Sequence, residues 1–443
     1  MDPLLIALIV AVFTLITLFS GIPIAFGLSF VSVVLLVSFE GFQMLEVFAE
    51  TFYAGLNSFV LLSIPMFILM GMAVANSPAG KDLYTGLDRW LWRLPGGLVI
   101  SNIGACSIFA ALSGSSPATC AAIGTMGIPE MRKRGYSDQI ATGTIAAGGT
   151  LGVLIPPSIV LIVYGMATGT SIGRLFLCGL IPGFMLAGLF AIWALIHSYF
   201  IDKDAAKALR RKKPPTLKEK LEVLPRVLPF LFIIAGVLYV LYGGVATPSE
   251  ASGVGAFLVF VLIAVVYKIY QPKKIWNIIK VSMKESVMIM FIIAASYFFS
   301  FTLSQLYVTQ SLAQSMIELS ANKWVIFFLI NIFLLVAGFF LPPVAVIVMT
   351  SAILLPVITT LGFDPYWFAI VFTINMEIGL ITPPVGLNLY IIKGITPDVS
   401  LSEILKGSIP FMLMMALAIV ILCIFPEIVT WLPDKLMGKP LGY

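Results

Sequence analysis

Long apolar stretches separated by short polar connections make up most of this 443-residue chain. A helix that crosses a bilayer needs roughly 20 predominantly apolar residues. Stretches of this kind predict crossings at residues 4–20, 22–38, 59–76, 138–168, 174–199, 227–244, 253–270, 286–304, 366–396 and 409–431. The pattern therefore predicts an all-α polytopic membrane protein.

Two further apolar stretches, at 97–130 and 323–361, are interrupted near their middle. The first contains Ser113-Gly114-Ser115-Ser116-Pro117, and the second contains Leu341-Pro342-Pro343. We predict that both are re-entrant helical hairpins, because backbone that leaves the helix at membrane depth is tolerated only where it is buried in protein or lines a cavity. Two crossings are also interrupted, by Pro156-Pro157 and by Pro383-Pro384, and we expect broken helices there.

The two halves of the chain resemble each other. A shift of 227 positions (356 minus 129) lays Pro129 on Pro356, Gly152 on Gly379, and Pro156-Pro157 on Pro383-Pro384. Five predicted crossings separate equivalent points, and an odd number inverts the second copy. Inverted repeats are typical of secondary transporters, whose site lies near the bilayer midplane. We expect a first repeat over 1–199 with hairpin 97–130, a linker over 200–226, and a second repeat over 227–443 with hairpin 323–361. Chance agreement of Gly and Pro is the alternative.

Composition and charge support a membrane protein and set its predicted orientation. Hydrophobic residues make up 60% of the chain and charged residues 11%, which excludes a soluble globular protein. The linker 200–226 carries nine Lys or Arg against four acids, so we predict that it is cytoplasmic. The mouth of the first hairpin then falls on the cytoplasmic side, and the mouth of the second hairpin and both termini fall on the periplasmic side. Since the net charge of +5 lies mostly in such loops, we expect contact with membrane lipid and no nucleic-acid partner.

The tip of the first hairpin offers oxygen ligands for a cation. Ser113, Ser115, Ser116 and Thr119 carry hydroxyls, and Gly114 lets the backbone turn and present carbonyls. Hard cations take oxygen ligands, so we predict a sodium site at this tip. The positive N-terminus of the returning half-helix favours a solute carboxylate at the same place. A Ser/Gly packing seam between helices is the alternative.

The two broken helices predict a second group of ligands. In the first, Gly152 precedes Pro156, Pro157 and Ser158, and the prolines free upstream carbonyls. In the second, Thr382 and Gly386 flank Pro383-Pro384, with Asn375, Glu377 and Asn388 nearby; a proline kink used only for packing is the alternative. A carboxylate in a crossing is unfavourable unless paired, neutralised or facing water, so Glu377 either joins the ion site or accepts backbone amides as a structural group.

Motifs for ATP hydrolysis and for zinc-dependent hydrolysis are missing from the sequence. There is no G-x-x-x-x-G-K-[ST] loop and no H-E-x-x-H helix. The four cysteines are singly placed in apolar stretches and are interpreted as core thiols. We therefore expect no enzyme activity and no organic cofactor.

The motifs at the breaks resemble those of the large membrane subunit of tripartite ATP-independent periplasmic (TRAP) transporters, the DctM type. The resemblance rests on the segments Ser113-Gly114-Ser115-Ser116-Pro117-Ala118-Thr119, Leu154-Ile155-Pro156-Pro157-Ser158 and Asn375-Met376-Glu377-Ile378-Gly379-Leu380-Ile381-Thr382-Pro383-Pro384-Val385-Gly386. It implies an inverted-repeat elevator-type transporter. It also implies two partners, a small four-helix membrane subunit (DctQ type) as a separate polypeptide and a periplasmic solute-binding protein (DctP type).

The resemblance also implies which residues bind sodium. The sodium ligands would be Ser113, Ser115, Ser116, Thr119 and Gly152 on one side, and Leu341, Thr382 and Gly386 on the other. The other residues of the breaks are the candidates for substrate binding: Gly114, Pro156, Pro157, Ser158, Asn375, Glu377, Pro383, Pro384 and Asn388.

The predicted function is sodium-coupled import of a small organic anion, a C4-dicarboxylate or a sialic-acid-like carboxylate, across a bacterial inner membrane, with Na⁺ as the co-transported ion. An ion channel is the alternative, because re-entrant helices also build selectivity filters. An intramembrane enzyme is a third hypothesis, but no pair of nucleophile and base lies at depth.

Overall fold

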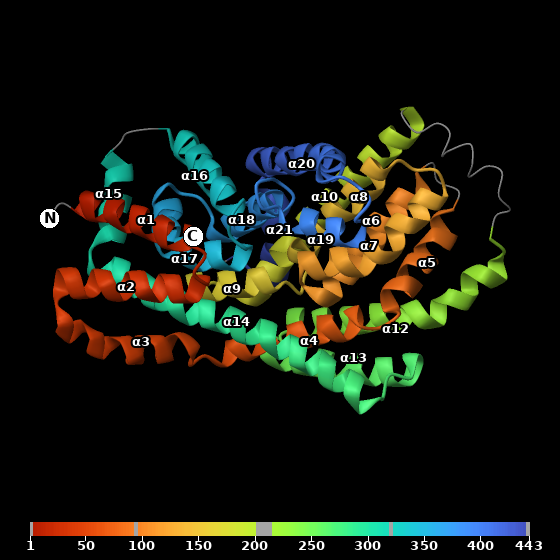
Figure 1. The fold of residues 1–443 in the computed structure, drawn as a ribbon, viewed down its shortest axis with the longest axis horizontal. Coiled ribbons are helices and arrows are strands. Elements are labelled where there is room, and N and C mark those ends of the chain that lie inside the picture. Colours follow the sequence, from red (N-terminus) through yellow and green to blue (C-terminus); the bar gives the residue numbers. More distant parts are fainter. Residues whose placement is uncertain (1–2, 93–95, 201–214, 319–321, 440–443) are drawn as a thin grey trace.

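The computed structural model describes residues 3–92, 96–200, 215–318 and 322–439, which form helices and connecting turns without a β-strand (Figure 1). The first half contains α1 (Pro3–Phe19), α2 (Ile24–Glu40), η1 (Phe42–Leu45), α3 (Glu46–Leu56), η2 (Phe59–Leu62), α4 (Ser63–Ala75), α5 (Ala79–Leu91), α6 (Gly97–Ser113), α7 (Ser116–Lys133), α8 (Asp138–Leu154), α9 (Ile159–Thr168) and α10 (Ile172–Phe200). The second half contains α12 (Leu217–Tyr242), α13 (Pro248–Tyr267), α14 (Pro272–Gln305), α15 (Val308–Glu318), α16 (Lys323–Gly338), α17 (Pro343–Thr360), α18 (Pro365–Leu380), α19 (Leu387–Ile395), α20 (Leu401–Ile424) and α21 (Glu427–Met437).

The prediction of an all-α polytopic membrane protein is confirmed. Within the described residues, six helices are long and apolar enough to cross a bilayer: α10, α12, α13, α14, α17 and α20. Two helix pairs reach the same length only together, across a bend of 41° between α8 and α9 and of 57° between the α3 and α4 segments. The first of these bends is the predicted broken helix, and the second was not predicted.

Both interrupted hairpins are present. Helix α6 ends at Ser113, Gly114 adopts the left-handed conformation (φ 59°), and α7 begins at Ser116. A left-handed residue directly after a helix is most easily supplied by glycine, so this residue allows the chain to reverse here. In the second half, α16 ends at Gly338 and α17 begins at Pro343. Helices α18 and α19 are likewise separated by residues 381–386, as the Pro383-Pro384 pair predicts.

Some boundaries differ from the predicted ones. Helix α14 starts at Pro272 rather than at 286, because its first turns carry lysines that lower the apolar average of that stretch. Helix α12 starts at Leu217, inside the predicted linker, where Thr216 and Glu219 form a capping box. Residues 201–214 of that linker lie outside the described residues. The short helices α3, α5 and α15 were not predicted, since each mixes polar and apolar residues over only 11 to 13 positions.

The order and lengths of the helices repeat along the chain. Helix α17 begins and ends 227 positions after α7, and α18 begins 227 positions after α8. The Pro156-Pro157 and Pro383-Pro384 peptide bonds are both cis. The packing also repeats. Helix α13 is the counterpart of α2 in the second half, and α13 contacts α4 just as α2 contacts α14. The division of the chain at the linker and the sidedness of each hairpin stay predictions.

The helices form two groups that meet along α4 and α14. Helices α2, α3, α4, α12, α13 and α14 run along one edge in Figure 1, and the hairpins, broken helices, α10 and α20 lie on the other side of them. Helix α8 is buried from Ile140 to Leu154 and α18 along its whole length, so both broken helices belong to the core of the second group. Contacts of α4 with α6 and of α14 with α17 join the groups near the hairpins.

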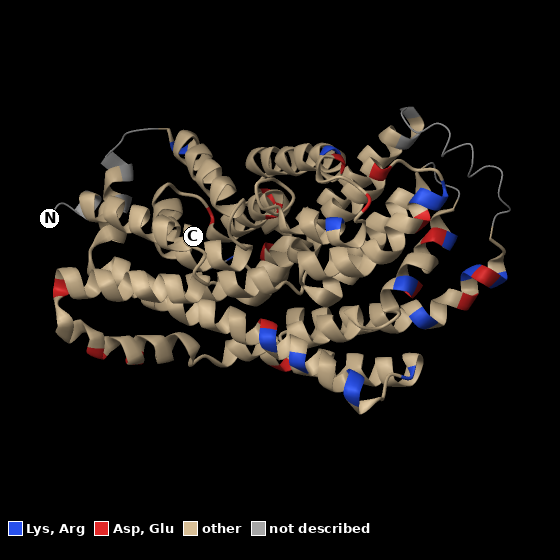
Figure 2. Ribbon diagram, viewed as in Figure 1, with Lys and Arg blue, Asp and Glu red and all other residues tan. Residues whose placement is uncertain are grey.

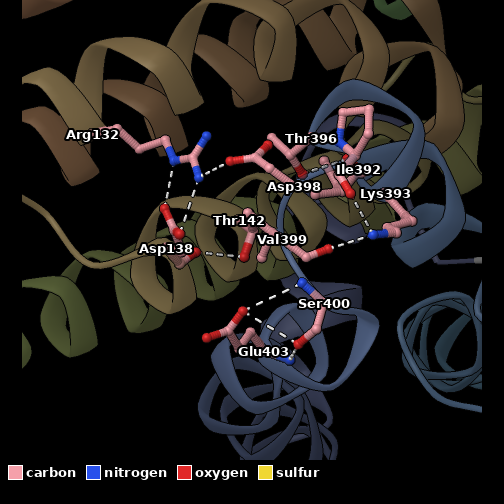
Figure 3. A network of polar contacts seen from close by, with 11 residues as sticks. Arg132, Asp138, Thr142, Ile392, Lys393, Thr396, Asp398, Val399, Ser400 and Glu403 are labelled. Atoms are coloured by element: carbon pink, nitrogen blue, oxygen red, sulfur yellow. Dashed lines mark hydrogen bonds and ion pairs between the residues drawn. The ribbon is translucent and has the colours of Figure 1, made fainter.

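Charged residues gather at one end of the molecule. Figure 2 shows most Lys and Arg near α5, the start of α12 and the α13–α14 turn, whereas the end formed by α1, α2 and α3 carries few charges. This asymmetry agrees with the pattern used to predict the cytoplasmic side. The turns of the two halves also contact each other, because Arg132, in the last turn of α7, bonds both Asp138 at the start of α8 and Asp398 in the α19–α20 turn (Figure 3).

Candidate functional site

Three oxygen atoms lie together at the first hairpin tip. Ser113 Oγ and Thr119 Oγ1 are 3.0 Å apart, and Thr119 Oγ1 donates to the Ser115 carbonyl at 2.9 Å. Ser113 Oγ lies 3.4 Å from the same carbonyl. Ser113 and Thr119 are buried, at 3% and 0% exposure. We call this group the tip oxygen cluster; its chemistry suits a hard cation, which takes hydroxyl and carbonyl oxygens as ligands.

Glycines of α8 allow the tip to approach this helix closely. A Cβ at Gly152 would lie 3.0 Å from the Ser115 carbonyl oxygen and 3.1 Å from Thr119 Oγ1. One turn earlier, a Cβ at Gly149 would lie 3.0 Å from the Ser116 carbonyl oxygen. The structure therefore brings four of the predicted ligands, Ser113, Ser115, Thr119 and Gly152, into one group.

The side chain of Ser116 points elsewhere. Its hydroxyl donates to Glu377 Oε2 at 2.5 Å, and the Asn388 amide reaches the same hydroxyl at 3.5 Å and the Ala146 carbonyl at 3.2 Å. Ser116, Glu377 and Asn388 are at most 1% exposed. Glu377 Oε1 and Asn388 Oδ1 have no hydrogen-bond partner among the described residues. Ser116, a predicted sodium ligand, and Glu377 and Asn388, both candidates for substrate binding, form one buried group contributed by α7, α18 and α19.

The first Pro-Pro break packs against the tip of the first hairpin. A Cβ at Gly114 would lie 3.0 Å from the Pro157 carbonyl oxygen, so the tip turn and the break are in contact. Ser158 caps α9 by accepting a hydrogen bond from the Leu161 amide at 3.3 Å. Pro156, Pro157 and Ser158 are all buried.

The second tip and second break are arranged differently. A Cβ at Gly386 would lie 3.1 Å from the Thr382 carbonyl oxygen, and Thr382 Oγ1 donates to the Ile378 carbonyl at 2.6 Å. Leu341 is partly buried, and the second hairpin meets α18 where a Cβ at Gly379 would lie 2.6 Å from the Gly338 carbonyl oxygen. Pro383 and Pro384 are exposed, in contrast to Pro156 and Pro157.

Asn375 lies away from the tip oxygen cluster. Its amide donates to the Asn331 carbonyl at 2.9 Å and to Asn331 Oδ1 at 2.8 Å, which ties α18 to α16. The contact places Asn375 in the packing of the second hairpin against its broken helix.

The two hairpin tips converge on one cavity of about 860 Å³. Gly114, Ser115 and Ser116 line it from the first tip, and Pro342 and Pro343 line it from the second. Helix α14 forms another wall through residues 285 to 292, so the cavity lies at the boundary between the two helix groups. Its volume falls in the range of small-molecule sites, about 300 to 1,000 Å³.

Comparison with known proteins identifies the family. Residues 9–428 match the family described as "Tripartite ATP-independent periplasmic transporter, DctM component". The chain belongs to this DctM family. Its membership makes it a multi-pass protein of the bacterial inner membrane and a transporter permease rather than an enzyme.

Several curated DctM-family proteins are similar over nearly their whole length. The C4-dicarboxylate TRAP transporter large permease protein DctM of Vibrio cholerae is 34% identical over 441 residues, covering 95% of this chain and 96% of that protein. The DctM protein of the same description from Pseudomonas aeruginosa is 35% identical, over 85% of this chain and 87% of that protein. The sialic acid TRAP transporter large permease protein SiaM of V. cholerae is 30% identical, over 95% and 97%.

A solved structure supports the fold of this DctM-family chain. The YdaH transporter of Alcanivorax borkumensis, whose crystal structure has an unusual topology, aligns with a TM-score of 0.64 at 14% identity. The alignment covers 98% of this chain and 99% of the YdaH chain.

Two charged residues that line the cavity of this DctM-family chain, and one buried amide on α6, were not predicted from the sequence. Lys81 at the start of α5 and Glu285 on α14 are the charged side chains among the described residues that line the cavity. Asn102 on α6 is fully buried, and neither atom of its amide has a hydrogen-bond partner among the described residues. Lys81 and Glu285 lie outside the predicted crossings, so hydropathy gave no signal for them. Asn102 could have been noticed in the sequence, because it is a polar residue within the apolar stretch 97–130.

Proposed function

We propose that this permease couples the inward movement of sodium ions to the import of a small organic anion. The observation that carries the proposal is that both hairpin tips line one cavity and the first tip carries the tip oxygen cluster. The cargo is a carboxylate of the C4-dicarboxylate or sialic-acid-like class.

The oxygen chemistry at the tip supports sodium as the coupling ion. Ser113 Oγ, Thr119 Oγ1 and the Ser115 carbonyl lie within 3.4 Å of one another, close enough to bind one cation together. All three are neutral oxygens, which favours a monovalent cation over a divalent one that takes carboxylate ligands. The second site, at Leu341, Thr382 and Gly386, has less support, because the Thr382 hydroxyl already donates to the Ile378 carbonyl in the last turn of α18.

The cavity supports an anionic cargo. It is lined mainly by apolar side chains, with hydroxyls and backbone of the first tip at one end and Lys81 as the cation among the described lining residues. Helix α7 begins at Ser116, beside the cavity, and the positive end of a helix favours a carboxylate. Relatives are named for C4-dicarboxylate, sialic acid and isethionate, which are all small organic acids and agree with this chemistry.

Transport proceeds by an elevator movement in this proposal. The hairpins and broken helices pack together as one group, while α2, α3, α4, α12, α13 and α14 form the other. The first group, with cargo and ions at the tips, slides along the second. A small membrane subunit of the DctQ type and a periplasmic binding protein of the DctP type complete the system, and both termini are periplasmic.

Reconstitution in liposomes tests the proposal. The permease is combined with the small subunit and the binding protein encoded beside it, and uptake of labelled C4-dicarboxylate and sialic acid is measured with and without an inward sodium gradient. We expect one of these two solutes to be taken up, and only when the inward sodium gradient is present. Uptake that ignores sodium would count against the coupling, and currents far above carrier rates in a bilayer recording would favour the ion channel.

A further inference from the structure

The hydroxyl of Ser116 is held by residues of the other half of the chain. Ser116 opens α7 in the first half, whereas Glu377 lies in the last turn of α18, before the second break, and Asn388 follows that break. The Ser116–Glu377 hydrogen bond joins residues 261 positions apart, and both side chains are removed from solvent. A hydrogen bond removed from solvent in this way is stronger than one at the surface.

This bond acts on the tip oxygen cluster through one peptide unit. Ser115, whose carbonyl belongs to the cluster, directly precedes Ser116. The carbonyls of Ser115 and Ser116 both lie against glycines of α8, at Gly152 and Gly149. The Thr119 amide and hydroxyl also hold the Ser115 carbonyl, so the Ser116 side chain adds a restraint on the peptide unit that carries it.

The same two partners flank the second break on both sides. Glu377 precedes residues 381–386 and Asn388 follows them, and this segment contains Thr382 and Gly386. A rearrangement of the break that moves either flank changes how Ser116 is held. Mutual influence of this kind is reciprocal for equilibrium binding.

We propose that Glu377 is a positioning residue, supported by Asn388: through Ser116 it sets the sodium affinity of the tip oxygen cluster and links that cluster to the second Pro-Pro break. The assignment rests on the proposed sodium coupling. It replaces the predicted role of Glu377 and Asn388 in contacting the substrate.

Sodium-specific thermal stabilisation of the purified full chain in detergent tests this link without a transport assay. The Tm is measured against increasing NaCl, with choline chloride as the ionic-strength control, because a ligand that binds the folded state raises its stability. We expect Glu377→Met, which fills the volume without an acceptor for Ser116, to raise the sodium midpoint roughly tenfold, the effect of losing one buried hydrogen bond and leaving the Ser116 hydroxyl unpaired. Glu377→Gln keeps an oxygen acceptor and should stay within about threefold of the parent.

A double-mutant cycle separates positioning from direct coordination. If Glu377 acts through Ser116, Ser116→Ala and Glu377→Met remove the same bond, so the double variant should match either single variant. Thr373→Val is the matched control, since Thr373 lies one turn before Glu377, is equally buried and donates to the Ala369 carbonyl within its own helix.

The outcomes are distinct. Additive effects of Ser116→Ala and Glu377→Met, or a Glu377→Gln variant as weak as Glu377→Met, would overturn positioning in favour of a direct charged ligand. A Glu377→Met variant with the same sodium midpoint as the parent would also overturn the positioning role. If the parent itself shows no difference between NaCl and choline chloride, the sodium coupling fails, and the inference fails with it.

Discussion

Gly152 of α8 lies directly against Thr119 of the first hairpin, where a Cβ would come within 3.1 Å of the Thr119 hydroxyl oxygen. Such a contact is tighter than ordinary packing, and its other neighbour is the backbone carbonyl of Ser115 at 3.0 Å. The absence of a side chain at position 152 therefore lets the tip oxygen cluster form.

We expect Gly152→Ala to displace the tip and raise the sodium concentration for half-maximal uptake several-fold, while the protein still inserts into the membrane. The measurement is sodium-dependent uptake in the reconstituted system. Gly188→Ala on α10 is the control, because a Cβ there meets no described atom within 4 Å. Equal sodium dependence of both variants would contradict the placement of the cluster.

Thr382 offers a test of the second predicted ion site. Its hydroxyl donates to the Ile378 carbonyl, so Thr382→Ala frees that carbonyl and removes one oxygen from the break. We expect a several-fold higher sodium requirement for uptake. Thr302→Ala removes a comparable hydroxyl that bonds the Phe298 carbonyl within α14 and should leave the sodium requirement unchanged. If Thr382→Ala and Ser116→Ala both transport like the parent at limiting sodium, the predicted ion sites are misplaced.

The interruptions of the fold could be predicted because their cause is local. Gly114, left-handed directly after Ser113, and the paired prolines at 156–157 and 383–384 interrupt the helices at their own positions, so the breaks fall where the sequence pattern places them. Helix α5 escaped prediction because it buries only one face against the rest of the protein, and hydropathy averages over both faces.

The partners of the site residues could not be predicted, because they depend on tertiary packing. Ser116 and Thr119 lie one turn apart, yet Thr119 joins Ser113 while Ser116 turns to Glu377. Asn375 and Glu377 lie two positions apart on α18, and a helix directs such residues to different faces. Asn375 accordingly meets Asn331 on α16, while Glu377 reaches the first hairpin.

The charges that line the cavity should act on the cargo with opposite signs. Lys81 attracts an anion and Glu285 repels one, and both line the same cavity. We expect Lys81→Gln to raise the concentration of anionic cargo for half-maximal uptake several-fold, and Glu285→Gln to lower it, with the larger effect for a dianion. Raising the salt concentration should reduce both effects. Lys280→Gln on α14, outside the cavity lining, is the control; effects of equal sign for the two cavity charges would refute this electrostatic role.

Asp398 provides a pH-dependent test of the contact between the turns of the two halves. Arg132 lies between Asp138 and Asp398, and it donates to Asp138 Oδ2 at 3.0 Å (Figure 3). The hydrogen bond from the Arg132 guanidinium holds the pKa of the Asp398 carboxyl below its usual range. A carboxyl whose pKa is lower in the folded state adds stability above the pKa of the unfolded chain, about 3.9 for Asp, and this contribution is lost as the pH falls through the lowered value.

We therefore expect Asp398→Asn to lower the Tm slightly near neutral pH, since Asp398 is exposed and the pair is screened by solvent. The difference from the parent should shrink as the pH falls below about 4 and disappear only below the lowered pKa of the folded Asp398 carboxyl, where the parent is protonated as well. Thermal unfolding in detergent across this pH range measures the difference, with Glu46→Gln on α3 as the control for removing one acid. A Tm difference that persists unchanged at acidic pH would mean that the Asp398→Asn substitution disturbs the turn itself, and that the Arg132 contact does not hold the two halves together through charge.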